Sequence, residues 1–298
     1  MNQKDFAKVF AILVGAIMIF SAFASFVMRG GDPAEGGDTS SLDQGSLEDF
    51  GRNGRLVDMS FASLQDVLQM CPEETVLAYW IDADASQNLT EAARAAIPPA
   101  IPPGLGLRYG SSLYPNKISR MATALMNDSW LEFHWVRPFS VGYQSLVIPY
   151  DGFMIIPSNA DFSTVIGKPI LIGPQPNLEM VLDVISGDFP TDLFTLPYDE
   201  AADLQIAGLG KSLAAESIFA RPLGGDYEEF YVGLTASGAD GYALIARYIS
   251  PGTAASGRAN QIATQFGLAV STEADTLTVE GSVGQDRLTD LLSALLAP

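Results

Sequence analysis

VFAILVGAIMIFSAFASFVM, residues 9–28, is a run of twenty residues without a charged side chain. At a rise of 1.5 Å per residue, a helix of this length spans about 30 Å, the thickness of the hydrocarbon core of a bilayer. Later apolar runs are short and are broken by Gly, Pro or charged residues. The stretch therefore predicts a transmembrane anchor to which the rest of the chain is attached as a globular body.

The charges around this run predict its orientation. Lys4 and Lys8 precede it, whereas only Arg29 follows it closely. Positive residues collect on the cytoplasmic side of a membrane, so we expect residues 1–8 in the cytoplasm and the body outside the cell membrane. The sequence thus predicts a single-pass protein with an extracytoplasmic C-terminal body.

A cleaved signal peptide is the alternative interpretation of the same run. Ala22-Phe23-Ala24 has the small-x-small form of a cleavage site, which would release a chain beginning at Ser25. The apolar run continues beyond this point to Met28 and completes a membrane-length span, which favours a retained anchor. Both interpretations export the remainder of the chain.

Residues 29–54 are rich in Gly, Ser and Asp and contain almost no apolar residues, which predicts a flexible linker.

The whole chain of 298 residues has a formal net charge of −19. So acidic a protein repels nucleic acids and anionic headgroups, so nucleic acid is excluded as a partner. A single cysteine excludes an intrachain disulfide. Acceptor triplets for N-glycosylation begin at Asn88 and Asn127, as expected for exported surface segments.

The sequence of the body predicts an α+β fold in two domains, residues 55–160 and 175–298. Each domain is expected to have an antiparallel-rich sheet covered by helices on one side. Short turns between strand candidates, such as Tyr150-Asp151-Gly152, permit only antiparallel neighbours. The stretch Pro169–Pro176 separates the two domains, because proline sustains neither a helix interior nor a central strand.

Hydrophobic periodicity and end signals predict the individual elements. Helices are expected at residues 61–70, 88–96, 117–126, 254–267 and 287–296, and at 178–187 behind a cap at Asn177. Strands are expected at residues 75–81, 130–136, 145–157, 165–172, 192–196, 217–220, 229–235, 242–249 and 276–280.

His134 is the only histidine, so any Ser-His-Asp triad would need it. It alternates with Phe133 and Trp135 along a predicted strand, which places it on the solvent side together with Glu132. No Gly-x-Ser-x-Gly turn accompanies it, so we assign it no catalytic role. Cys71 follows a predicted helix end, where a thiol pKa is raised, which argues against a nucleophile.

Two acidic clusters, Asp82-Ala83-Asp84 and Asp226-Tyr227-Glu228-Glu229, lack the spacing of a calcium loop and are interpreted as solvated surface. The segment Gly208-Leu209-Gly210-Lys211-Ser212 lacks the first glycine of a phosphate-binding loop and follows no good buried strand. The sequence therefore predicts no catalytic, cofactor-binding or metal-binding residues.

The opening DFAKVFAILVGAIMIFSAFASFVM, followed by a Gly/Asp/Ser-rich linker and an acidic, cysteine-poor body, resembles single-pass, membrane-anchored surface proteins of methanogenic archaea. The resemblance covers the first thirty or so residues and the general layout. It implies an archaeal type of cell envelope and no functional residue.

Three hypotheses for the function follow. The first is a non-catalytic, membrane-tethered extracytoplasmic module that binds a protein partner or assists an envelope or membrane complex. The second is a carboxylate-dependent hydrolase, since paired Asp and Glu side chains need no histidine. The third is a solute-binding receptor with a cleft between its two domains.

Overall fold

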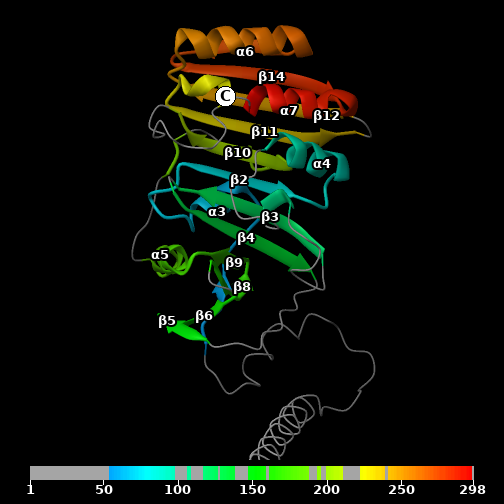
Figure 1. Cartoon of the computed structure of the whole chain (residues 1–298). Coiled ribbons are helices and arrows are strands. Elements are labelled where there is room, and N and C mark those ends of the chain that lie inside the picture. The colour runs from blue at the N-terminus through cyan, green and yellow to red at the C-terminus, as the bar shows by residue number, and fades with distance from the viewer. Residues whose placement is uncertain are drawn as a thin grey trace, which may run out of the picture. The chain divides into compact units, whose positions relative to one another are not determined.

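The described part of the chain is built around one large antiparallel sheet with helices on both faces (Figure 1). The computed structural model describes residues 54–97, 106–108, 117–126, 128–137, 147–158, 161–187, 193–195, 199–210, 222–238 and 241–296. The predicted α+β class with an antiparallel-rich sheet is confirmed. The expected anchor, residues 9–28, lies outside the described residues, and within the described ranges no helix is long and apolar enough to cross a membrane.

Twelve strands form the sheet in the described ranges, and each is antiparallel to its neighbours. Two further short strands, β1 (Val57–Asp58) and β8 (Gly167–Lys168), pair in parallel beside it. In spatial order, the strands of the large sheet are β13 (Ala269–Glu273), β14 (Thr276–Gly284), β12 (Gly241–Ile249), β11 (Glu229–Ser237), β10 (Leu204–Leu209), β2 (Leu77–Asp82), β3 (Lys117–Leu125), β4 (Trp130–Arg137), β9 (Ile170–Gly173), β7 (Ser163–Val165), β6 (Phe153–Pro157) and β5 (Ile148–Tyr150).

Two hydrophobic cores lie on the two faces of this sheet. The first contains buried residues of α4 (Gln87–Ala96), α6 (Thr253–Phe266) and α7 (Leu288–Leu296). The second contains buried residues of α3 (Leu64–Leu68) and α5 (Gln175–Ile185). Three short 3-10 helices complete the described elements: η2 (Gly106–Arg108), η3 (Pro222–Gly225) and η4 (Gln285–Arg287). Helices therefore cover both faces, and not the single face expected from sequence.

The predicted division into two domains, 55–160 and 175–298, is wrong. Residues 51–298 form one unit, and its sheet is continuous across the expected boundary. The strand β2 of the first half pairs with β10 of the second half from Leu77↔Gly208 to Leu204↔Ile81. Helix α4 also packs against α7, so the two halves share the first core.

The prolines at the expected domain boundary lie at the ends of helices and strands and do not interrupt them. Strand β9 begins directly after Pro169 and ends before Pro174, so neither ring removes a hydrogen bond from the strand. Helix α5 starts at Gln175, and Pro176 lies in its first turn, where the missing N–H has no intrahelical partner to lose. Proline at the ends of elements is therefore compatible with one continuous sheet.

Residues 117–126, expected as a helix, form β3 instead. The strand lies between β2 and β4, and both of its faces are buried: Met121 and Leu125 belong to the first core and Ala122 and Ala124 to the second. A strand covered on both faces loses the polar and apolar alternation that identifies strands. Its small and unbranched residues then produce a helix-like pattern that strand pairing overrides.

One local prediction is confirmed, and two helix ends show their determinants. Tyr150-Asp151-Gly152 forms the turn between β5 and β6, and both Asp151 and Gly152 have the positive φ of a tight hairpin turn. Ser63 caps α3 through its side chain. Gly267 ends α6 with a φ of 74°, a left-handed conformation that favours glycine. Strands β10 and β13 were not predicted, because Gly208 and the polar residues of β13 weaken the strand pattern.

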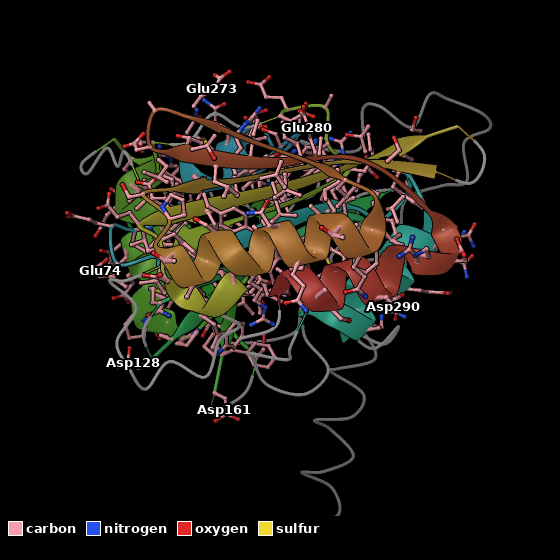
Figure 2. All side chains as sticks on the ribbon, turned by 90° about the horizontal axis from the view of Figure 1, so that it is seen from above. Glu74, Asp128, Asp161, Glu273, Glu280 and Asp290 are labelled. Carbon is pink, nitrogen blue, oxygen red and sulfur yellow. The ribbon has the colours of Figure 1, made fainter. Side chains whose placement is uncertain are left out.

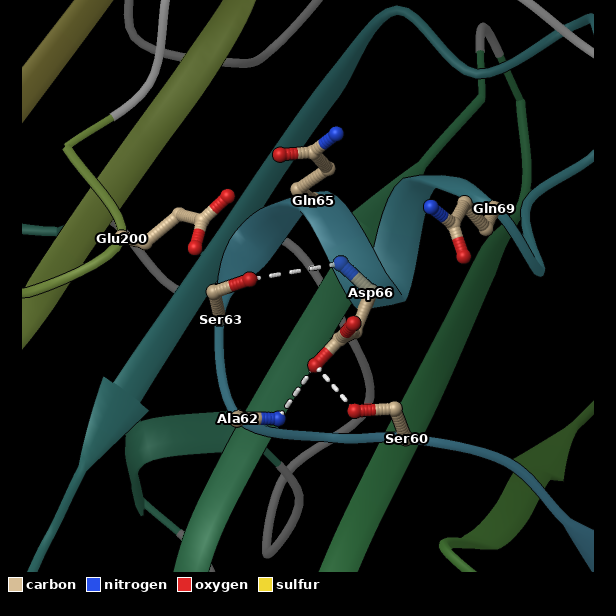
Figure 3. A pocket seen from close by; sticks show the side chains of 7 residues that line it. All are labelled: Ser60, Ala62, Ser63, Gln65, Asp66, Gln69 and Glu200. Atoms are coloured by element: carbon tan, nitrogen blue, oxygen red, sulfur yellow. Dashed lines mark hydrogen bonds between the residues drawn. The ribbon is translucent and has the colours of Figure 1, made fainter.

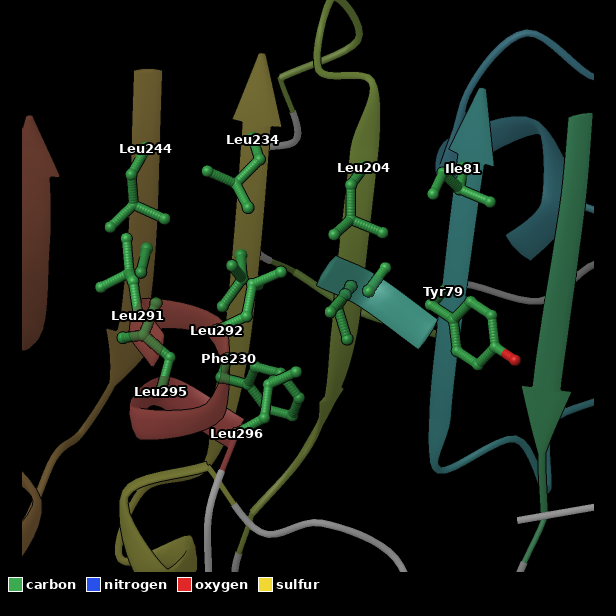
Figure 4. Packing of buried hydrophobic residues seen from close by; sticks show 14 of the residues in the cluster. Tyr79, Ile81, Leu204, Phe230, Leu234, Leu244, Leu291, Leu292, Leu295 and Leu296 are labelled. Atoms are coloured by element: carbon green, nitrogen blue, oxygen red, sulfur yellow. The ribbon is translucent and has the colours of Figure 1, made fainter. Parts of the chain in front are cut away.

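Helix α7 closes the first core over the C-terminal half of the sheet. Leu291, Leu292 and Leu295 are all fully buried and face residues such as Leu234 and Leu244 of β11 and β12 (Figure 4). Complete burial of a leucine side chain stabilises the folded chain by about 2 kcal/mol. This short helix therefore contributes strongly to holding the last strands in place.

Candidate functional site

A row of polar side chains is buried in the first core, on the central strands of the sheet. Tyr79 of β2, Thr123 of β3 and Glu132 of β4 are aligned in register, and directly paired residues of antiparallel strands lie on the same face. His134, two residues after Glu132, lies on that face as well. Each of these four side chains is at most 5% exposed.

Glu132 and His134 form a buried pair. Nε2 of His134 lies 3.1 Å from Oε2 of Glu132, and both side chains are 0% exposed. The alternation predicted along this strand is confirmed, but the prediction that it faces solvent is wrong. The second face of β4 is covered by the first core, which includes Trp130 and Val136.

The hydroxyl of Tyr79 lies in the same dry region. Burial raises the pKa of Tyr79 well above its usual value, and the charge of Glu132 raises this pKa further, whereas Thr123 and the Leu107 backbone act in the opposite direction. Leu107 belongs to η2, which is fastened to α4 by a hydrogen bond of 2.7 Å from Nε of Arg94 to the Leu107 carbonyl. The tyrosine therefore stays protonated, and the backbone of η2 lies beside its hydroxyl.

A carboxylate beside an imidazole can hold and exchange a proton, which is the chemistry of a general base. Catalysis also requires that a substrate reach these atoms. Glu132 and His134 are completely buried, and neither lines the depression described below. We therefore interpret the pair as a structural element of the core.

The described part of the chain has a polar surface depression at the start of α3 (Figure 3). Its lining consists of Ser60, Ala62, Ser63, Gln65, Asp66, Gln69 and Glu200. Oδ2 of Asp66 accepts a hydrogen bond of 2.8 Å from the Ser60 hydroxyl and another from the backbone N–H of Ala62. The Ser63 hydroxyl accepts from the N–H of Asp66 at 3.5 Å. These bonds fix the entry of the chain into α3.

Two carboxylates, Asp66 and Glu200, line this depression without facing each other. In Figure 3 the Asp66 carboxylate points toward Ser60 and Ala62, away from Glu200. An Asp66 that already accepts two structural hydrogen bonds is not poised as a nucleophile or base. The depression thus does not provide the opposed carboxylates that glycoside hydrolysis requires.

The remaining sequence candidates have structural roles or fall outside the described residues. Asp82 and Asp84 pair with Arg120 and Lys117, respectively. Glu229 accepts hydrogen bonds from the backbone and hydroxyl of Thr195. Among the described residues, no group of three or more His, Cys, Asp or Glu side chains could hold a metal ion.

The structure also places Cys71, Gly208 and Asn177, which the sequence singled out. Cys71 is buried, and its burial raises the pKa of the thiol to about 12, so it is not a reactive thiolate. Gly208 lies inside β10, a buried strand that the sequence did not predict, while Lys211 and Ser212 lie outside the described residues. Asn177 is not the cap of α5. It lies within the helix, and its buried amide donates to the Trp130 carbonyl at 3.1 Å.

An open surface that the sequence did not predict lies at the C-terminal end of the sheet. On β12, β14 and β13, one face packs on α6 and α7, and the other is exposed or half-buried. Figure 2 shows Glu273 and Glu280 on the side away from these two helices. The open face carries, by pairing register, Ala243, Ile245, Arg247, Ile249, Ala269, Ser271, Glu273, Thr276, Thr278, Glu280 and Ser282. Alternation of buried Tyr242, Leu244 and Ala246 with these positions was the available signal.

The glycosylation triplets are only partly described. Asn88 is exposed in the first turn of α4, so its side chain is accessible from solvent, although it belongs to a helix and not to a loop. Asn127 lies outside the described residues.

No family model and no curated protein matches the chain. Among solved structures, crystal form I of TP0453 is similar with a TM-score of 0.44 and 12% sequence identity, and covers 77% of this chain and 97% of that chain. Crystal form III of TP0453 gives the same TM-score and identity, with 76% of this chain and 98% of that chain covered. A TM-score at this level establishes neither a shared fold nor a shared function.

Proposed function

We propose that the chain is a non-catalytic, membrane-tethered extracytoplasmic module that binds a protein partner of an envelope or membrane complex. Residues 9–28 are the anchor, residues 29–54 are the flexible linker, and the body lies outside the membrane. The charge-free run and the lysines before it support the anchor and its orientation.

The open face on β12–β14–β13 is the observation that carries this proposal. Its exposed positions are small or polar, as in Ala243, Ser271 and Ser282, so they leave the face flat. Ile245 and Ile249 on β12 are half-buried at the border of this face, where they pack against the second core. The face therefore presents a flat, mainly polar area on β14 and β13 beside the apolar side chains of β12.

The structure favours this proposal over the two alternatives. A solute-binding receptor with an interdomain cleft requires two domains, whereas residues 51–298 form one unit with one continuous sheet. A carboxylate-dependent hydrolase requires opposed carboxylates, whereas Asp66 is held by Ser60 and Ala62 and turns away from Glu200. Neither alternative has a described site that supports it.

Purification of the tagged full-length chain from its native membranes tests the proposal. We expect a stoichiometric protein partner to copurify with the wild type. The double variant Ser271→Arg/Ser282→Arg places two bulky charges on the open face and should lose that partner.

The matched control is Gln261→Arg/Thr264→Arg, which places two arginines on the exposed surface of α6. It should retain the partner. Absence of any stoichiometric partner from the wild-type preparation would refute the proposed function. Equal recovery with both double variants would show that the partner binds elsewhere.

A further inference from the structure

The two edges of the large sheet differ in their protection against strand pairing. Strand β5 at one edge has three residues, and its central residue, Pro149, has no N–H to donate. Strand β13 at the other edge has five residues, with no proline, lysine or bulge in its pairing with β14. Natural sheets use short length, proline and lysine to block edges. Only the β5 edge is blocked in this way.

The geometry of the β13–β14 hairpin identifies the backbone groups that point outward. The turn contains two residues, Ala274 and Asp275, between the paired Glu273 and Thr276. A two-residue turn closes on a hydrogen-bonded pair, and alternate residues of an antiparallel strand point their N–H and C=O groups to opposite sides. Val270 and Thr272 therefore direct theirs to the open edge, where the described residues provide no neighbouring strand.

The charges beside this edge favour a basic occupant. Glu273 lies on β13 itself, and Glu280 is paired directly with Ala269, so both carboxylates border the same open face. A strand added next to β13 places alternate side chains on this face, beside Glu273 and with Glu280 one strand further in, behind the small Ala269. Lysine or arginine at those positions gains cross-strand pairing, and acidic residues are repelled.

A second copy of the chain fits the same edge poorly. In a two-fold antiparallel pairing through Val270 and Thr272, Glu273 of each copy lies opposite Ala269 of the other. Ala269 is already paired with Glu280, so like charges would border the junction twice. Two carboxylates on one face, with a single alanine between them, repel each other and disfavour this pairing. A different polypeptide is the better occupant.

We propose that β13 is the recognition element of the module and that it takes, by strand addition, an extended basic segment of the partner protein. This inference rests on the proposed function and specifies the chemistry of the partner. Backbone hydrogen bonds to Val270 and Thr272 provide the affinity, and carboxylates of Glu273 and Glu280 provide the selectivity. The strand addition extends the sheet beyond its present edge.

Amide hydrogen exchange of the full-length chain in detergent micelles tests this inference. The probe is a synthetic peptide of alternating lysine and threonine, and the control peptide has glutamate in place of lysine. We expect the lysine peptide to slow exchange of the Val270 and Thr272 amides at least tenfold and the glutamate peptide to leave them unchanged. Exchange already slow without peptide would contradict the inference, because another segment of the chain would occupy the edge.

Two variants separate backbone from side-chain effects. Thr272→Pro removes the outward N–H, whereas Thr272→Ala keeps it and removes only the side chain. Thr272→Pro should weaken binding of the lysine peptide at least tenfold, and Thr272→Ala should bind as the wild type does. Glu273→Lys, which leaves the backbone intact, should also weaken binding. Equal affinities of all three variants would overturn the inference.

Purification from native membranes distinguishes this inference from the proposed function. If Thr272→Pro retains the partner that the wild type recovers, strand addition is wrong and the proposed function stands. If the wild type itself recovers no partner, the proposed function fails. Loss of the partner from Thr272→Pro, with retention by Thr272→Ala, supports both.

Discussion

Nε2 of His134 lies 3.1 Å from Oε2 of Glu132 in a part of the core where both side chains are completely buried. Desolvation of a charge is costly, and a buried charge without its partner is more costly still. The pair therefore makes the central strands sensitive to the loss of either residue.

His134→Leu should lower the free energy of unfolding by about 3 kcal/mol, because it leaves the Glu132 carboxylate without its partner. The double variant Glu132→Leu/His134→Leu should be more stable than the single variant. Urea unfolding followed by tryptophan fluorescence measures both. As a control, Asp84→Asn breaks the exposed pair with Lys117 and should change stability by about 1 kcal/mol or less. A double variant less stable than His134→Leu would contradict this account.

Tyr248 and Tyr242 lie on the same face of β12 but differ in their hydroxyl groups. The Tyr242 hydroxyl is hydrogen-bonded to the Ser86 hydroxyl at 2.6 Å. The buried Tyr248 hydroxyl has no hydrogen-bond partner among the described residues, and burial raises the pKa of Tyr248.

Tyr248→Phe should therefore raise the free energy of unfolding by about 1 kcal/mol, since it removes a buried unpaired hydroxyl. Tyr242→Phe should lower it by a similar amount, about 1 kcal/mol, because Ser86 loses its partner. Thermal and urea unfolding of the two variants are compared with the wild type. The same sign of change in both variants would be inconsistent with the structure.

Cys71 provides a single-site test of burial, because the chain has one cysteine. The folded state raises the pKa of the thiol to about 12, so it should not react with a thiol reagent at pH 8 until the chain unfolds. An unfolded thiol ionises from about pH 8.5. The free energy of unfolding should consequently fall as the pH rises from about 8.5 toward 12. Cys71→Ala should show a smaller fall, and rapid labelling of the folded chain would contradict the burial.

The proposed membrane anchor predicts a specific proteolysis pattern. Protease added to intact cells should remove the body, whereas residues 1–28 should remain with the membrane. Mass spectrometry should then recover the intact N-terminus. A mature chain beginning at Ser25 would show instead that the segment is cleaved as a signal peptide.

Local signals in the sequence predicted local structure well. Asp151-Gly152 predicted a hairpin because these residues accept positive φ. The apolar spacing of residues 61–70 predicted a helix there, and α3 forms within that range. Each of these features is determined by neighbours a few residues apart.

Features set by distant pairing were not predicted. The segment Lys117–Leu125 has a helix-like pattern because the two cores bury both of its faces. The pairing of β2 with β10, which joins the two halves, brings together residues more than one hundred positions apart and leaves no local signal. The burial of Glu132 and His134 likewise depends on distant parts of the chain, because the first core that covers this face of β4 includes residues of both halves.

A photo-crosslinking residue at position 271 of the full-length chain, in its native membranes, tests the central claim most directly. Ser271 lies on the open face of β13, and the same residue at position 261, on the exposed surface of α6, is the control. We predict that illumination links position 271 to one extracytoplasmic protein and leaves position 261 without that product. Linkage of that protein to position 261 alone, or to neither position, would contradict the claim that the C-terminal end of the sheet binds a partner.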